Sequence, residues 1–263
     1  MHKKLNFLIS FLLALLIFTF GFNPPKHQFN LKSNLNSNII VEKNELLEII
    51  HKLNEKNSLI NNLVVKIKIR DKLTSLTGDV FYEKDKNFRM YTYSLFGLEG
   101  DIGSNEDIFW FWSKRYNQST LFYVKHEDIE KTRLKSQYKP SFLIENFGLS
   151  CINDDCDISI SENRVKLLFV NDNFKIEKIL NIKKLFFDKI SVFENDKLIY
   201  DCSVIKYQLL NNNFYYPQIL EIKIYDENIT FYWYLEDPKF NQKINKIHWQ
   251  KPNFNNQIDL SEY

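Results

Sequence analysis

The stretch "SLFGLEGDIGSNEDIFWFW" (residues 94–112) decides the fold class of this protein, because it fits either a nucleotide-binding loop or a turn before a strand. It holds three of the six glycines and two of the four tryptophans in the 263-residue chain. A phosphate-binding loop needs glycines that lead from a strand into a helix, with Lys and Ser or Thr at its end. Here Glu99, Asp101, Glu106 and Asp107 surround the glycines, and an aromatic segment follows. We therefore interpret the stretch as the turn "SLFGLEG" followed by a strand.

The segments around this stretch predict a large antiparallel sheet. In residues 62–70, apolar and basic residues alternate, which is typical of a strand with one buried face. A second series of strand patterns with short polar turns runs from residue 163 to residue 237, and 242–250 is a last candidate strand. Residues 41–57 show helical spacing, and short helices are expected within 126–149. The order lacks βαβ alternation and predicts an α+β fold.

Several of the predicted strands are apolar on both faces. Residues 107–114 ("DIFWFWSK") and 229–235 ("ITFYWYL") are examples. Such strands are either covered on both sides or have one side that lines an apolar cavity. A curved sheet with a helix across its mouth would satisfy both conditions, although an aromatic-rich strand taken alone is more often core than ligand pocket.

The N-terminus predicts export. Residues 1–23 begin with "MHKK" and continue without a charge from Leu5 to Phe22, as in a secretory signal peptide or a signal anchor. The positive residues before the apolar run place the rest of the chain outside the cytoplasm. No clear cleavage site and no acylated cysteine follow, so both forms stay open. Residues 24–40 are a polar tether, and 41–263 form the folded domain.

The residue pattern points to no reaction and no cofactor. The GxSxG signature of a hydrolase is absent, the five histidines are dispersed, and we expect no metal site. The net charge of +2 without a basic stripe argues against nucleic acid. Cys151 and Cys156 are candidates for a disulfide in an oxidising compartment, with free thiols or zinc as alternatives, and Cys202 is expected inside a strand.

Taken together, the order of these segments resembles the LolA/LolB superfamily of lipoprotein carriers and receptors, over most of residues 41–250. The segments that carry the resemblance are "GDVFYEKDKNFRMYT" (78–92), "SLFGLEG" (94–100), "NEDIFWFW" (105–112), "KPSFLIENFGL" (139–149) and "YYPQILEIKIYDENITFYW" (215–233). The sequence departs from the family pattern at Glu106, where a glycine is expected.

The resemblance implies an open, incomplete antiparallel β-barrel of about eleven strands with helices covering its mouth. Its interior would receive acyl chains of lipoproteins in transit to an outer membrane. The lining candidates are Phe81, Met90, Trp110, Trp112, Phe122 and Trp233. Leu95, Phe96 and Leu98 would form a membrane-contact loop, or would instead fold inward as core.

The family's carrier holds its lid with an Arg-Pro pair at the turn after the second strand. Lys84 and Asp85 stand at the matching positions here, so Lys84 is the candidate for this latch. The expected protein is a non-enzymatic, monomeric, periplasmic lipid-binding protein, as carrier or as receptor. The alternatives are a membrane-anchored half-barrel sensor that binds a protein partner, and an exported enzyme.

Overall fold

A computed structural model describes residues 43–71, 74–84, 87–132, 134, 144–149, 151–152, 156–161, 163–171, 174–210 and 214–262. The predicted signal segment (1–23) and tether (24–40) lie outside these residues. None of the described helices is both long and apolar enough to cross a bilayer.

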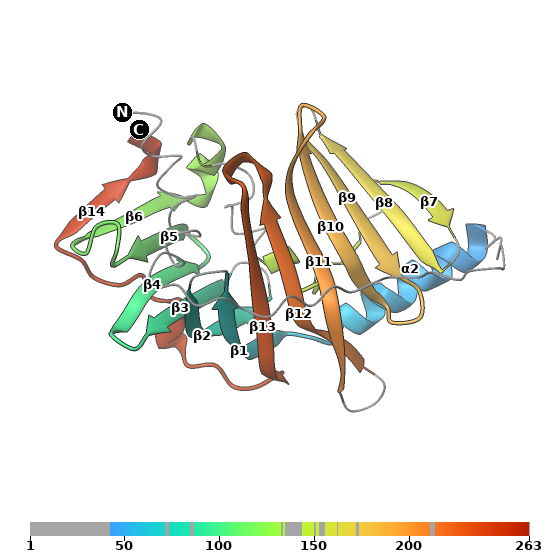
Figure 1. Cartoon of the computed structure of the whole chain (residues 1–263), viewed down its shortest axis with the longest axis horizontal. Coiled ribbons are helices and arrows are strands. Elements are labelled where there is room, and N and C mark those ends of the chain that lie inside the picture. The colour runs from blue at the N-terminus through green and yellow to red at the C-terminus, as the bar shows by residue number, and fades with distance from the viewer. Residues whose placement is uncertain are drawn as a thin grey trace.

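The described residues form one α-helix and a single sheet of fourteen strands (Figure 1). The helix is α2 (Lys43–Ser58). The first series of strands is β1 (Asn62–Arg70), β2 (Ser75–Glu83), β3 (Asn87–Ser94), β4 (Gly97–Ser104), β5 (Ile108–Ser113) and β6 (Thr120–Lys125). The second is β7 (Asp157–Ser161), β8 (Arg164–Asn171), β9 (Phe174–Asn181), β10 (Phe186–Glu194), β11 (Lys197–Leu210), β12 (Phe214–Ile224), β13 (Ile229–Phe240) and β14 (Asn256–Asp259). Short 3-10 helices include η1 (His126–Lys131), η4 (Tyr225–Glu227), η5 (Lys246–Trp249) and η6 (Leu260–Glu262).

The sheet consists of two antiparallel meanders joined at one seam. Its order is β14-β6-β5-β4-β3-β2-β1-β13-β12-β11-β10-β9-β8-β7. β1 pairs antiparallel with β13 at the seam, and β14 pairs parallel with β6 at one edge. Figure 1 shows α2 beside the strands of the second meander. The open, mainly antiparallel sheet that the sequence predicts is therefore present.

The expected number of about eleven strands is wrong, because the described sheet has fourteen. β4 begins inside segment 94–100, which we interpreted as a turn, and only Leu95 and Phe96 separate it from β3. β7 and β14 are short strands that the sequence analysis also missed. The prediction of a strand at 242–250 is wrong as well. The second half of this segment forms the 3-10 helix η5, and the segment contributes no strand to the sheet. The expectation of several covering helices is not matched, because the described part of the chain has one long helix, α2, and otherwise only short helical turns.

The main hydrophobic core lies on the inner face of the sheet, where α2 covers it. The helix buries Leu46, Ile50 and Leu53, which lie on the stripe that its sequence predicts. β1 buries every second residue in the same core, from Leu63 to Ile69, so the predicted alternation is confirmed.

Residues 144–149 pack on the same inner face beside α2. The ring centroid of Phe147 lies 5.9 Å from that of Trp233 and 6.3 Å from that of Phe88. Gly148 has a φ of +63°, and a Cβ atom there would lie 2.3 Å from the Phe186 ring. A side chain at position 148 would thus be strained and would collide with the core. We call α2 together with residues 144–149 the inner cover.

Candidate functional site

The predicted lining residues divide between the two faces of the sheet. Met90, Phe122 and Trp233 belong to the main core on the inner face. Trp110 and Trp112 belong to a separate buried cluster on the outer face, together with Leu121. Contact with lipid remains a prediction for all of them.

The register of β4 against β5 explains this division. Ile102, which faces the inner core, pairs with Phe111, so the neighbouring Trp110 and Trp112 must point to the opposite face. The inward residues of β5 are therefore Phe109 and Phe111, one position away from the predicted tryptophans. Both faces of this strand are apolar, so the alternation pattern could not assign them.

Phe81 also lies on the outer face. Its neighbours Val80 and Tyr82 are buried in the main core, whereas Phe81 stacks on His248 at a centroid distance of 3.9 Å and an interplanar angle of 17°. Burial lowers the pKa of His248, and the nearby Arg89 guanidinium lowers it further. The imidazole that covers Phe81 is accordingly biased toward its neutral form.

The inner face offers an apolar surface with few polar atoms. Tyr216 and Trp233 are fully buried there, and the described residues provide no hydrogen-bond partner for the Tyr216 hydroxyl or the Trp233 Nε1. A buried polar group without a partner costs about 1–3 kcal/mol. The covered state of this face is therefore less stable than a fully satisfied core would be.

The inner cover is held by a small number of polar contacts. Within the cover, the Asn57 side chain donates to the Gly148 carbonyl at 3.3 Å. Between the cover and the rest of the domain, the Tyr200 hydroxyl donates to the Asn146 side chain at 2.7 Å, and Lys56 Nζ donates to the Leu185 carbonyl at 2.7 Å. Glu145 forms an ion pair of 2.5 Å with Lys178. The remaining contacts of the cover are mainly apolar, and an apolar ligand on the same surface could replace them.

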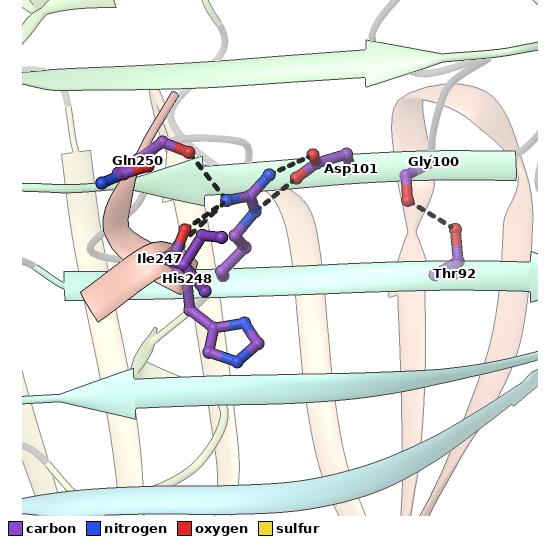
Figure 2. A network of polar contacts seen from close by, with 7 residues as sticks. Thr92, Gly100, Asp101, Ile247, His248 and Gln250 are labelled. Carbon is purple, nitrogen blue, oxygen red and sulfur yellow. Dashed lines mark hydrogen bonds and ion pairs between the residues drawn. The ribbon is translucent and has the colours of Figure 1, made fainter. Parts of the chain in front are cut away.

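A buried Arg89 joins the C-terminal segment to Asp101 on β4. Figure 2 labels its partners Asp101, His248 and Gln250. The Arg89 Nε and Nη2 donate to Asp101 at 3.0 and 2.6 Å. Its Nη1 donates to the carbonyls of Gln250 at 2.7 Å and of His248 at 3.1 Å. Burial raises the pKa of Asp101, and the guanidinium opposes this shift. We call residues 242–259 the C-terminal strap.

The strap covers the outer cluster of aromatic residues. Phe254 packs on Trp112 at a centroid distance of 5.6 Å, and the Lys251 ammonium lies 4.1 Å from the ring centre of Tyr123. Beneath the strap, Trp110 is fully buried, and a Cβ atom on Gly103 would lie 2.2 Å from its indole. Gly103 thus serves close aromatic packing rather than phosphate binding.

Leu95 and Phe96 form an exposed apolar tip at the β3–β4 turn, with 100% and 82% of their surface accessible. The turn below them is fixed by the nearly buried Glu99, which accepts from the Ser94 hydroxyl at 2.6 Å and from Arg115 Nε at 3.0 Å. The third predicted tip residue, Leu98, is half-buried against the outer cluster. The structure therefore places two of the three predicted tip residues in solvent.

The other predicted site residues lie outside these groups. The exposed Lys84 follows β2, and its backbone N–H donates to the Asn61 carbonyl at 2.8 Å. Its role as a latch remains a prediction, and Asp85 lies outside the described residues. The sulfurs of Cys151 and Cys156 are not joined in the structure, so their disulfide remains a prediction, whereas Cys202 is buried in β11 as expected.

The sequence analysis missed Arg89 and its strap contacts. A basic residue inside an aromatic strand was the available signal, but its carbonyl partners lie about 160 residues further along the chain. The described residues contain no group of His, Cys, Asp and Glu side chains suited to hold a metal ion.

Comparison with known proteins identifies the fold. No family model and no curated protein matches the sequence. Among solved structures, a domain from Vibrio parahaemolyticus, assigned by name to outer membrane lipoprotein sorting, matches with a TM-score of 0.54 at 8% identity, covering 77% of this chain and 95% of that chain. A DUF1329 family protein from Desulfovibrio piger matches with a TM-score of 0.50 at 8% identity and the same coverage. The chain therefore has a LolA-like fold, as the sequence resemblance predicts.

Proposed function

We propose that this protein is a non-enzymatic carrier or receptor that binds the acyl chains of lipoproteins, or of other lipids, in transit to an outer membrane. The observation that carries the proposal is the broad apolar inner face under a cover with few polar contacts. Each methylene moved from water to such a face contributes about 0.8 kcal/mol, so affinity requires apolar area rather than a catalytic group.

In this proposal the inner cover moves aside or is displaced when a chain binds. Phe147 is fully buried between Phe88 and Trp233, in the space that an acyl chain would occupy. Met90 and Phe122 lie on the same face and would extend the lining. The polar atoms of Trp233 and Tyr216 that lack partners reduce the stability of the covered state, which favours exchange of the cover for a ligand.

The exposed tip would deliver or collect the lipid at a membrane. Leu95 and Phe96 project from a turn that Glu99 fixes, and Lys114 Nζ donates to the Phe96 carbonyl at 3.1 Å. An apolar tip with a cation at its base suits insertion among lipid headgroups. In this assignment residues 1–23 direct export, 24–40 form a tether, and 41–263 work as a periplasmic monomer.

The central experiment measures bound lipid. Protein exported by cells and purified without detergent should release acyl lipids that mass spectrometry detects, and should bind a fluorescent acyl probe. Phe147→Ala should increase probe binding because it opens the inner face, whereas Phe81→Ala on the outer face should leave it unchanged. Absence of both lipid and probe binding, or equal effects of the two variants, would refute the proposal.

A second experiment tests the tip and the N-terminus. Leu95→Ser combined with Phe96→Ser should preserve acyl-probe binding but slow lipid transfer to vesicles of phosphatidylethanolamine and phosphatidylglycerol. Unchanged transfer would remove the membrane role of the tip. N-terminal sequencing of the exported protein distinguishes a released carrier from the alternative of an anchored sensor, in which residues 1–23 remain.

A further inference from the structure

Lys56 is a largely buried cation at the end of the inner cover. It lies in the last turn of α2, and its Nζ donates to the Leu185 carbonyl at 2.7 Å. The ring centres of Phe214 and Phe186 lie 4.3 and 5.3 Å from this Nζ. No carboxylate among the described residues forms an ion pair with it. Burial lowers its pKa to about 8, with no opposing contribution from an acidic group among the residues that the structure describes.

The same two rings contact a second unsatisfied group. The Tyr216 ring centroid lies 6.1 Å from that of Phe186 and 6.5 Å from that of Phe214. Tyr216 is fully buried, and its hydroxyl has no hydrogen-bond partner among the described residues. Within the described residues, a cation without a counter-ion and a hydroxyl without a hydrogen-bond partner therefore lie beside the same two rings.

The Lys56 ammonium and the Tyr216 hydroxyl are both hydrogen-bond donors that suit the same kind of acceptor. An ammonium and a phenol hydroxyl can both donate to an oxyanion, and hydrogen bonds to a charged group are stronger in an apolar environment. The hydrogen-bonding capacity of the Lys56 ammonium is only partly used. One carbonyl and two ring faces take the place of the water molecules that would surround an exposed ammonium. The left-handed backbone of Leu185, with a φ of +48°, belongs to the turn whose carbonyl reaches this ammonium.

We propose that Lys56 and Tyr216 form a binding site for the oxyanion headgroup of an acidic amphiphile whose acyl chain lies on the inner face. The site is at the end of α2, where Lys56, largely buried but still partly accessible, meets solvent and fully buried Tyr216 meets the core. A headgroup there would keep contact with water while its chain continues over the apolar surface. The inference rests on the proposed function and narrows its ligand to amphiphiles with a carboxylate or a phosphate.

The test compares two ligands that differ only in charge. Binding of palmitic acid and of its methyl ester to the full-length protein is measured by displacement of a fluorescent acyl probe. Lys56→Met and Tyr216→Phe should each weaken palmitate binding, by about tenfold or more for Lys56→Met, and leave the ester unchanged. Lys52→Met is the matched control, because Lys52 lies on the exposed side of the same helix.

Tyr216→Phe keeps the ring and removes only the hydroxyl, so it retains the packing even if Lys56→Met perturbs the fold. A parallel titration with inorganic phosphate and with lysophosphatidic acid separates a headgroup site from a site for the free ion. Equal wild-type affinity for palmitate and its ester, or equal loss of both ligands in the variants, would overturn this inference alone. Failure of every amphiphile to bind would overturn the proposed function together with it.

Discussion

Arg89→Met should release the C-terminal strap and strongly destabilise the fold. The substitution keeps an unbranched apolar side chain and removes the guanidinium. The variant loses the donors to Asp101 and to the carbonyls of His248 and Gln250 in one step.

The magnitude follows from the burial of Asp101. The Asp101 carboxylate is 3% exposed, so in the variant it would stay buried without the cation that pairs with it. Removing one partner of a buried ion pair costs about 3–5 kcal/mol, against a total stability of about 5–15 kcal/mol for an ordinary domain. The pair between Arg164 and Asp188, at 3.2 Å, provides the control, because the Arg164 side chain is 64% exposed and Arg164→Met should cost at most about 1 kcal/mol.

Two assays follow the effect. Urea unfolding gives the free-energy difference, and limited trypsin digestion should cut the Arg89→Met variant after Lys243 and Lys246, which precede the anchored carbonyls of His248 and Gln250. Addition of Asp101→Asn should restore part of the stability, since it removes the unpaired charge. If Arg89→Met costs no more than Arg164→Met and the strap stays resistant to trypsin, Arg89 is not its anchor.

Three further outcomes are expected. Gly103→Ala should lower the unfolding free energy by about 1–3 kcal/mol and change the tryptophan emission spectrum, because its Cβ would lie 2.2 Å from the Trp110 indole; unchanged emission and stability would contradict this packing. The pKa of Lys56 is about 8 in the folded protein and 10.5 when exposed, so the unfolded chain binds the Lys56 proton more tightly. Between pH 8 and pH 10.5 the free energy of unfolding should therefore rise by up to about 3 kcal/mol relative to that of Lys56→Met. Parallel pH curves for the two proteins would disprove this prediction. If the predicted disulfide between Cys151 and Cys156 forms on export, the mass of the protein should rise by about 2 Da on reduction, and a constant mass would exclude that bond.

The sequence predicted elements whose pattern is local, and failed where partners are distant. The helical stripe of α2 and the alternation in β1 follow from neighbouring residues, which is why both are confirmed. The glycines and acidic residues of β4 are typical of a loop in sequence. They lie in a strand because Gly103 makes room for the Trp110 indole and Asp101 accepts from Arg89, and both partners come from adjacent strands. The face of each tryptophan in β5 depends on register, which a strand apolar on both sides does not encode.

The candidate site was predictable to a similar extent. The turn pattern predicted a loop at Leu95 and Phe96 but left open whether these side chains are exposed or buried, and the structure exposes both. Lys56 was indistinguishable from the other lysines of its helix, because its aromatic neighbours come from β10 and β12. Only tertiary packing separates a buried lysine from an exposed one at neighbouring helical positions.

The seam between β1 and β13 has a consequence for the rate of folding. Except at this seam and at β14, every strand pairs only with its immediate neighbours in the chain. Pairing Leu63 with Phe240 closes a loop of about 180 residues, which costs about 2.5 kcal/mol more in chain entropy than a ten-residue hairpin. The hairpins of each meander should therefore form first, and amide protons at the seam should gain protection from hydrogen exchange last.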